Sequence, residues 1–490
     1  MVETYLPDFL LILPEILLIL TALLILGGGV IRQTPAPRHF GYMALGGLLL
    51  AFCALLICHK AGESWTSFEG QVLQNDFIYF GKIIIFVSAA AVLILSLTPL
   101  LHDQLLSFEY AALILFATSG MLLMLSANDF LNLFVALEIQ GLSLYILAAL
   151  NRDSGLSAEA ALKYFILGAV ATAFYLYGTS LLYGFAGSTH FEVLARSIHM
   201  DVAVLPLGLC IGLLFIISAF AFKMSAAPFH MWTPDVYEGC PTAIVAFIAN
   251  APKGVAALVL LRLLMDPFLI LYPLWSPLFL GLAVLSMVWG TLAALSQTNI
   301  KRFLAYSTIA QMGYVCLGLA TGVREGLQGV LVYVSLYLVM MIGVFGSLLC
   351  LRNKKAETFD SLAGFGSLHP CLAFFLALLM FSLAGIPPFA GFFAKFYIFK
   401  AAIAEGFVSI AVLGMVTSVV AAFYYLRIIK IMYFKSSDDL APEFYGQTVV
   451  ASSGMGIVLI LCAGVLLFFC LFPDPFLLMV QRASLVFTGF

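Results

Sequence analysis

The sequence predicts an all-α polytopic membrane protein with about fourteen transmembrane helices. Hydrophobic residues make up 63% of the 490 positions and charged residues only 10%, which is too little polar surface for a water-soluble globule of this length. Apolar runs of spanning length recur along the chain, and short connections collect most of the charges. Runs such as 278–295 and 457–472 are apolar on every side, which indicates helices and not the alternating strands of a β-barrel.

The predicted spans are roughly 10–30, 39–58, 77–100, 110–127, 130–150, 160–186, 203–232, 241–265, 274–295, 301–321, 327–351, 370–404, 407–434 and 451–472. The seventh span contains Pro228, and Pro234 follows just after its approximate end. The twelfth contains Gly385, Pro387 and Pro388. Because a proline removes one intrahelical hydrogen bond, both spans are predicted to be interrupted near mid-membrane.

Lys and Arg side chains gather in alternate connections, among them Arg152, Lys301 and Arg302. By the positive-inside rule these connections face the cytoplasm, and an even number of helices then places both termini on the periplasmic side. The net charge of −3 is spread thinly, which favours membrane lipid as the surroundings and gives no basis for a nucleic-acid partner. Nucleotide-binding motifs, Cys-x-x-Cys pairs and His clusters do not occur in the sequence, so we expect no cofactor, metal or catalytic residue in this chain.

Four ionisable residues lie near the middle of predicted spans, namely Glu138, Lys223, Lys253 and Lys395. A charge at the centre of a lone lipid-facing helix costs roughly 2.5–3.5 kcal/mol, so these groups are expected to face the bundle interior or one another. Burial disfavours the charged form of each group and a nearby opposite charge restores it, so such groups can be switched. The hypothesis is a lateral proton relay at mid-membrane. The alternative is a set of structural ion pairs that fix helix register.

Other polar groups lie close to this row in the sequence. His230, Tyr314 and Ser307 are secondary relay candidates, which water would connect to the lysines. Lys163 lies near the cytoplasmic end of its predicted helix. Its side chain either extends to the membrane interface or takes part in proton uptake.

The two interrupted spans are five helices apart, and each brings a lysine close to its break at Pro228 or at Pro387 and Pro388. Lys223 precedes the first break and Lys395 follows the second. An odd offset makes the two halves enter the membrane from opposite sides, which predicts two inverted five-helix repeats with one broken helix each. The predicted organisation is three N-terminal helices in 1–105, repeats in 106–270 and 271–435, and a last helix with a tail in 436–490.

The stretch 222–242 reads Phe-Lys-Met-Ser-Ala-Ala-Pro-Phe-His-Met-Trp-Thr-Pro-Asp-Val-Tyr-Glu-Gly-Cys-Pro-Thr. It resembles the signature of the antiporter-like subunits of respiratory complex I and of related cation/proton antiporters. The resemblance includes 137–138, 299–314 and 382–395 and spans about 110–435. Lysine at positions 253 and 395, and three helices before the repeats, are similar to the bacterial subunit N branch, the counterpart of mitochondrial subunit 2. Subunits M and L differ at these positions or in having a long lateral helix.

The resemblance implies a role for each residue of the row. Glu138 would be the partner of Lys223, the pumping lysine; Lys253 would be the central relay, and Lys395 the group nearest the outer exit. Proton translocation would be coupled to NADH:quinone electron transfer in partner subunits, which would hold FMN, iron–sulfur clusters and quinone. The implied neighbours are subunits M, K and J in the bacterial inner membrane.

Two rival functions remain open on the sequence alone. The chain could belong to a multi-subunit cation/proton antiporter without a redox partner, or it could be a non-pumping scaffold of the membrane arm. A sodium pathway needs acidic or carbonyl-rich oxygen ligands around the helix breaks, where the sequence has mostly lysines. Substitution of Glu138 or Lys223 separates the scaffold from the relay, because a scaffold predicts lost assembly and a relay predicts weakened pumping.

Overall fold

The computed structural model describes residues 8–32, 37–198, 206–352, 358–435, 448–449 and 452–487. Within these ranges, 13 helices are long and apolar enough to cross a membrane. The short helices Pro370–Ala384 and Ala390–Ala404 together supply the remaining predicted span. The prediction of an all-α polytopic protein with about fourteen spans is confirmed. Residues 1–7 and 488–490 lie outside the described ranges, and the periplasmic location of the termini stays a prediction.

The N-terminal part contains three helices and a short hairpin. Its elements are α2 (Leu13–Arg32), α3 (Pro37–Cys58), β1 (Trp65–Ser67), β2 (Val72–Gln74) and α4 (Asp76–His102). β1 and β2 pair antiparallel between α3 and α4. An ion pair of 2.7 Å joins Glu15 of α2 to Lys82 of α4, with both side chains buried. This pair fixes α2 against α4, and the sequence analysis had not singled it out.

The next group of helices corresponds to the first predicted repeat. It comprises α5 (Phe108–Ser126), α6 (Phe130–Ala148), α7 (Gly155–Ala186), α8 (Phe191–Ser197), α9 (Leu207–Met224), α10 (Trp232–Gly239), α11 (Thr242–Ile248) and α12 (Ala251–Met265). Ser107, Asp129 and Ser154 begin α5, α6 and α7, and each side chain accepts a hydrogen bond from a backbone N–H of the first turn. Such caps satisfy donors that would otherwise be left without partners at a helix start.

The second group begins with the 3₁₀ turn η2 (Leu269–Leu271) and continues through α13 (Tyr272–Leu295), α14 (Ile300–Ala320), α15 (Arg324–Leu349), β3 (Leu351–Arg352), η3 (Phe359–Leu362), α16 (Phe365–Leu368), α17 (Pro370–Ala384), α18 (Ala390–Ala404) and α19 (Val408–Phe434). The last elements are β4 (Thr448–Val449), α20 (Ser453–Leu471) and α21 (Asp474–Ser484). β4 pairs with β3. The C-terminal helix α21 packs on α4 and α15.

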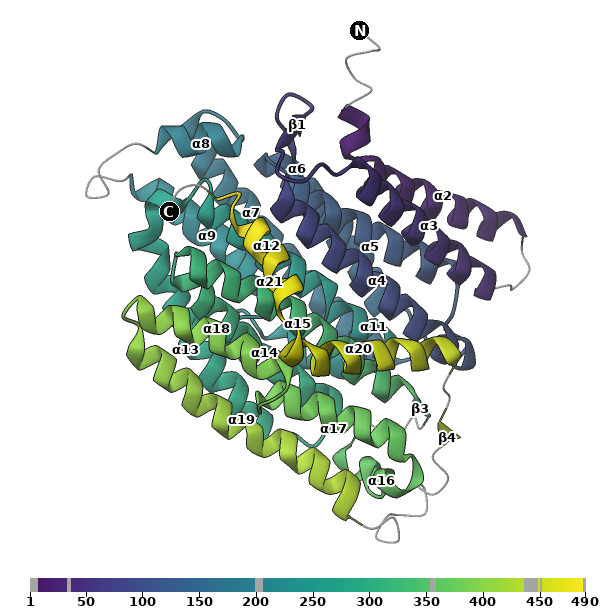
Figure 1. The fold of residues 1–490 in the computed structure, drawn as a ribbon. Helices are drawn as coiled ribbons and strands as arrows, with labels where there is room; N and C mark the ends of the chain where they lie inside the picture. Colours follow the sequence, from purple (N-terminus) through teal and green to yellow (C-terminus); the bar gives the residue numbers. More distant parts are fainter. Residues whose placement is uncertain are drawn as a thin grey trace.

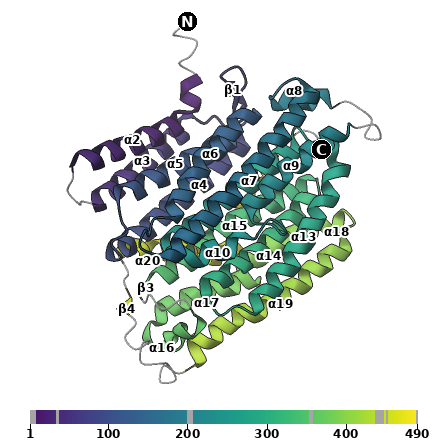
Figure 2. The same cartoon turned by 180° about the vertical axis from the view of Figure 1, so that it is seen from behind.

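The helices form an elongated bundle whose edges are made by distant parts of the chain. Figures 1 and 2 show α2 and α3 at one edge and α13, α18 and α19 at the opposite edge. Between them lie α12, α14 and α15, whose apolar windows are almost wholly buried. A polar side chain on these central helices therefore has no contact with lipid and must find its partners inside the protein.

Both predicted helix breaks are present, and they share one local design. α9 ends at Ser225 and α17 at Gly385, which adopt left-handed backbone angles with φ of 66° and 81°. Three residues later each break has a cis proline, Pro228 or Pro388. Pro234 is not part of the first break as predicted, because it lies in the first turn of α10, where no intrahelical N–H bond is lost. The predicted end of this span at position 232 is also wrong, since α10 continues to Gly239.

The eighth predicted span contains an interruption that the sequence analysis did not expect. α11 ends at Ile248 and α12 begins at Ala251. Asn250 lies between them, accepts a hydrogen bond from Ser88 (2.7 Å) and donates one to the Leu338 carbonyl (2.9 Å). This buried amide holds the interruption next to the first turn of α12, which carries Lys253.

Two close helix contacts support the division into two five-helix units. A Cβ atom on Gly120 of α5 would lie 2.7 Å from the backbone nitrogen of Gln140 in α6. A Cβ atom on Gly290 of α13 would lie 2.6 Å from the backbone nitrogen of Ala310 in α14. The first two helices of each unit thus touch backbone to backbone at a glycine. The unit boundaries and the inverted relation between the units stay predictions.

Candidate functional site

Lys253 lies at the first helix break, in the interior of the bundle. Its side chain is 1% exposed. The ammonium group donates a hydrogen bond to Ser225 Oγ at the end of α9. It also lies 4.9 Å from the ring centroid of Trp232 and 5.5 Å from that of Tyr237. Among the described residues no carboxylate pairs with this lysine, so a hydroxyl and two aromatic faces are what stabilise its charge.

Lys395 lies at the second break and has more oxygen partners. Its ammonium group donates to the carbonyls of Leu383 and Ala384, each at 3.1 Å, and to Ser418 Oγ at 2.8 Å. It also lies 5.1 Å from the Tyr314 ring centroid. The two carbonyls end α17, where the helix dipole is negative. The side chain is 5% exposed, so the broken helix binds this buried cation at its C-terminal end.

Glu138 and Lys223 differ from these two lysines because both are half-buried. The Glu138 carboxylate accepts a hydrogen bond from Thr172 Oγ1 at 2.8 Å. Lys223 donates to Tyr145 Oη at 3.3 Å. The two side chains do not form an ion pair in this structure. A Cβ on Gly141, three residues after Glu138, would lie 3.4 Å from the Lys223 ammonium, so the lysine reaches α6 about one helical turn along the chain from Glu138.

A stack of aromatic rings lies between Lys223 and Lys253. Tyr145, the hydrogen-bond partner of Lys223, packs edge to face on Tyr164 with centroids 4.8 Å apart. Tyr164 stacks on Trp232 at 4.5 Å. Trp232 is one of the two rings beside the Lys253 ammonium. The ends of the two lysine side chains are therefore connected through three rings that the bundle holds rigidly.

A second group of buried polar side chains contacts the backbone near Lys253 and near Lys395, and we call it the bridge cluster. It consists of Ser307, Thr308, Gln311, Tyr333, Tyr337 and Tyr425. Tyr337 donates to Thr308 Oγ1 at 3.1 Å and to the carbonyl of Ala249, at the interruption before Lys253, at 3.3 Å. Gln311 donates to the Leu383 carbonyl at 3.3 Å, and Lys395 donates to that same carbonyl.

Some of the secondary relay candidates contact the row of ionisable residues or the bridge cluster, and one does not. Tyr314 lies under Lys395, and Ser307 is hydrogen-bonded to Tyr425 in the bridge cluster. His230 is buried, with its ring 6.2 Å from that of Trp289, and no described hydrogen bond joins it to the four ionisable residues. The sequence analysis missed the other members of the bridge cluster. Their signal was present, because a Gln or Tyr on an apolar buried helix requires a hydrogen-bond partner.

Comparison with known proteins gives consistent results over the whole chain. Residues 127–421 match the family described as NADH:quinone oxidoreductase/Mrp antiporter, TM. NADH-quinone oxidoreductase subunit N of Paramagnetospirillum magneticum is 43% identical over 99% of both chains, and that of Rhodospirillum rubrum is 44% identical over 97% of both. The chain belongs to the subunit N family. It is an antiporter-like membrane-arm subunit of respiratory complex I.

Solved structures show the same fold over almost the whole chain. A chain of respiratory complex I from Thermus thermophilus superposes with a TM-score of 0.81 at 30% identity, covering 96% of this chain and 99% of that one. A chain of the Mrp complex from Dietzia superposes with a TM-score of 0.83 at 18% identity, covering 99% of this chain and 98% of that one. The second likeness shows a shared fold and nothing further.

The subunit has an ion-pair network where α7, α10 and α14 meet. Lys163 lies 2.8 Å from Glu159 and 2.7 Å from Asp235. Asp235 also pairs with Arg302 at 3.0 Å, and Arg302 pairs with Glu238 at 2.7 Å. Lys163 is therefore tied to α10, the second half of the first broken helix, and is linked through Asp235 to Arg302 of α14.

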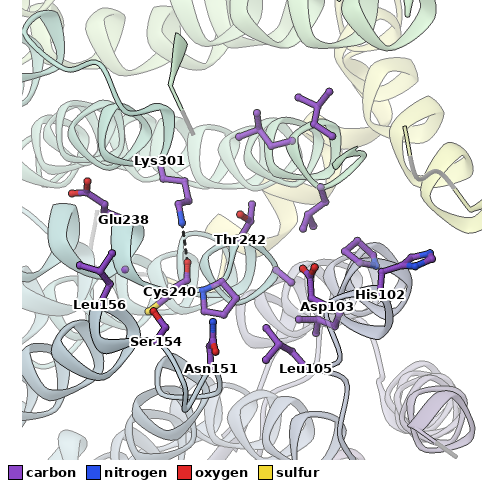
Figure 3. Close-up of a pocket in the computed structure, with 18 of the residues that line it drawn as sticks. His102, Asp103, Leu105, Asn151, Ser154, Leu156, Glu238, Cys240, Thr242 and Lys301 are labelled. Atoms are coloured by element: carbon purple, nitrogen blue, oxygen red, sulfur yellow. Dashed lines mark hydrogen bonds between the residues drawn. The ribbon is translucent and has the colours of Figure 1, made fainter. Parts of the chain in front are cut away.

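A cavity of about 710 Å³ lies next to this network. Figure 3 shows side chains around it, including Asp103 and Asn151 from connections and Glu238 from α10. Lys301 donates to the Cys240 carbonyl at 3.1 Å, at the C-terminal end of α10. The cavity thus borders the short helix whose Tyr237 faces Lys253. Within the described residues, no group of three or more His, Cys, Asp or Glu side chains could hold a metal ion.

Proposed function

We propose that this subunit carries protons across the bacterial inner membrane through Glu138, Lys223, Lys253 and Lys395, coupled to NADH:quinone electron transfer in partner subunits. The observation that supports this most strongly is the placement of two buried lysines, Lys253 and Lys395, at the two helix breaks, with side chains of the bridge cluster hydrogen-bonded to the backbone near each of them. Within the part of the chain that the structure describes, neither lysine has a carboxylate partner, so the charge of each depends on a few neutral groups that can rearrange.

Charge moves along the row by changing which partner supports each lysine. When the Glu138 carboxylate turns from Thr172 toward Lys223, it stabilises the lysine's positive charge. When it turns back, Lys223 keeps only the Tyr145 hydroxyl and ring, and loss of its proton becomes more favourable. The positive charge on Lys223 in turn disfavours a second charge on Lys253, which sends the next proton toward Lys395.

The cavity bordered by Lys301 is proposed as the cytoplasmic intake. Its lining comes from connections that carry Arg152, Lys301 and Arg302, the side that the positive-inside rule assigns to the cytoplasm. Three carboxylates in its lining, Asp103, Asp153 and Glu238, would attract protons. In this orientation both termini are periplasmic, Lys395 lies nearest the outer exit, and Lys163 stabilises α10 at the intake.

Redox chemistry is assigned to other subunits of the same complex. FMN, iron–sulfur clusters and quinone would be held by partner chains, since the relatives of this chain are named as subunits of an NADH-quinone oxidoreductase. Subunits M, K and J are the proposed neighbours. A stripe on α6 supports a protein neighbour beside Glu138, because Leu131, Val135 and Leu142 are about half exposed around a carboxylate that lipid would not solvate.

The cation/proton antiporter is the second candidate function. The similarity in fold to a chain of the Dietzia Mrp complex is the reason to consider it. The residues at both breaks disfavour it, because the groups that converge there are ammonium donors, which repel a sodium ion. Affinity purification of the tagged chain from native membranes separates the two: flavin and iron–sulfur subunits should co-purify, and antiporter subunits alone would overturn the redox assignment.

Substitution of the buried lysines tests proton transfer. We expect Lys253→Ala and Lys395→Ala to leave the complex assembled and to lower the proton gradient formed per NADH oxidised in membrane vesicles. Lys60→Ala is the matched control, because Lys60 is exposed between α3 and β1 and lies over the Trp65 ring. Intact pumping by both variants in a correctly assembled complex would show that the row does not carry protons. Lost assembly in both would favour the scaffold.

A further inference from the structure

Gln311 occupies the centre of the bridge cluster and contacts three other helices. It lies on α14 and is 3% exposed. Its amide oxygen accepts a hydrogen bond from Tyr333 Oη of α15. Its amide nitrogen donates to Tyr425 Oη of α19 at 3.2 Å and to the Leu383 carbonyl of α17 at 3.3 Å. One neutral side chain therefore links the Tyr333 and Tyr425 hydroxyl groups to the carbonyl that also binds Lys395.

The orientation of this amide is fixed by the protein. The Leu383 carbonyl can only accept a hydrogen bond, so the amide nitrogen must face it and the amide oxygen must face Tyr333. The Tyr425 oxygen accepts from Gln311 and also lies within hydrogen-bond distance of Ser307 Oγ, where either oxygen can donate. The donor order therefore runs from Tyr333 through Gln311 to Tyr425, and reversing it would require the amide to turn over.

Hydroxyl groups and water pass protons along a chain because each oxygen can both accept and donate. A primary amide cannot do this, because its nitrogen only donates and its oxygen only accepts. We propose that Gln311 is a positioning residue that interrupts proton transfer between the Lys253 side and the Lys395 side, and that it thereby prevents passive proton flow through this subunit. The inference rests on the proposed proton-carrying function. It assigns the barrier in the row to one side chain.

The same contacts couple the barrier to the charge of Lys395. Gln311 and the Lys395 ammonium donate to one oxygen, that of Leu383. If the ammonium moves away from this carbonyl, the Gln311 amide becomes its remaining donor, and the hydrogen bond between Gln311 and Leu383 becomes stronger. Loss of the proton from Lys395 would therefore hold the amide in place. This keeps the path closed when Lys395 has released its proton to the outside.

Gln311→Glu tests the barrier, because a carboxyl group has nearly the same shape and can both donate and accept a proton. In proteoliposomes that contain the whole complex without NADH, we expect a potassium diffusion potential to drive proton uptake roughly tenfold faster than in the unmodified complex, the factor for a barrier lowered by about 1.4 kcal/mol. Gln328→Glu is the matched control on α15, where the Gln328 amide donates to Ser484 Oγ. Proton uptake by this control should be as slow as in the unmodified complex.

The route of the leak provides the second measurement. Adding Lys395→Ala to Gln311→Glu should return proton uptake to the unmodified level, which a general loss of packing would not do. The proposal would be overturned if the Gln311→Glu complex takes up protons no faster than the unmodified complex. It would also be overturned if the faster proton uptake persists in the variant that lacks Lys395. If Gln311→Glu does not assemble, Gln311→His supplies another titratable group at the site, with the same expected leak and the same contradicting result. If NADH-driven pumping stops in Lys253→Ala but Gln311→Glu takes up protons no faster than the unmodified complex, the role of Gln311 as a barrier is refuted and the proposed proton-carrying function is not.

Discussion

The two helix breaks have the same backbone design but differ in what binds the end of the first half-helix. At the first break the Phe222 carbonyl accepts a hydrogen bond from the Trp232 indole at 3.0 Å. At the second break the Leu383 and Ala384 carbonyls accept from the Lys395 ammonium. A neutral indole therefore caps α9, whereas a cation caps α17. Lys253, the lysine at the first break, is left with one hydroxyl oxygen and two rings.

We infer from this difference that the two buried lysines would have different tasks in the proposed relay. The charge of Lys395 is stabilised by three oxygen atoms, two of them at the negative end of a helix dipole. The charge of Lys253 has weaker support and can be altered by a small movement of Ser225 or by the charge of a neighbour. Lys253 is therefore suited to pass protons on, and Lys395 to retain a proton until it is released.

The largest expected effect comes from the part of the second break that the first break lacks. A Cβ on Gly391, six residues after the left-handed Gly385, would lie 1.8 Å from the Ser382 carbonyl oxygen. The corresponding residue after Ser225 is Met231, which is 65% exposed. We expect Gly391→Ala to cost about 3 kcal/mol or more, because backbone atoms cannot yield to the added methyl group. The amount of assembled complex in the membrane measures it.

The control for this comparison is Met231→Ala at the first break. It removes a largely exposed side chain and should change stability by no more than about 0.5 kcal/mol. If Gly391→Ala and Met231→Ala assemble equally well, the α17–α18 contact is looser than the structure shows. The two breaks would then be equivalent in packing, and their difference would lie only in the lysines.

A smaller effect should separate the two lysines by their hydroxyl partners. Ser225→Ala removes the one oxygen atom that accepts from Lys253, whereas Ser418→Ala removes one of three that accept from Lys395. Loss of a hydrogen bond to a buried charge costs about 1–3 kcal/mol, so pumping should fall more in Ser225→Ala. Proton gradient per NADH oxidised is the measurement. Equal losses in the two variants would mean that Lys253 is not the more weakly supported lysine.

Much of this comparison could be predicted from the sequence, because its determinants are local. Prolines and a glycine within apolar spans predicted both breaks, and charges within those spans placed Lys223 beside the first break and Lys395 beside the second. Lys253 belongs to the next predicted span, and its contact with the first break was not predicted. The partners of each lysine could not be predicted in the same way. Ser225, Ser418 and the bridge cluster contact the row only through helix packing, which the sequence order does not show.

Other buried charges were missed because attention was given to the middle of each span. Lys82 lies in the second turn of α4 and pairs with Glu15. Arg262 lies in the last turn of α12, where it donates to the carbonyls of Leu125 and Ala127. Both are near helix ends, where a lysine or arginine usually reaches water. Their burial depends on neighbouring helices that cover those ends.

The smallest expected effect concerns the half-buried pair, Glu138 and Lys223. Tyr145→Phe removes the hydroxyl that accepts from Lys223 at 3.3 Å but keeps the ring, whose centroid lies 5.6 Å from the ammonium. Because Lys223 is half-buried, other polar groups or water can replace one long hydrogen bond, and the loss should be below about 1 kcal/mol. Pumping by Tyr145→Phe should therefore exceed that by Ser225→Ala. A loss as large as that of Ser225→Ala would mean that Lys223 is as tightly enclosed in the assembled complex as Lys253, which would place a protein surface, and not lipid, over this end of the row.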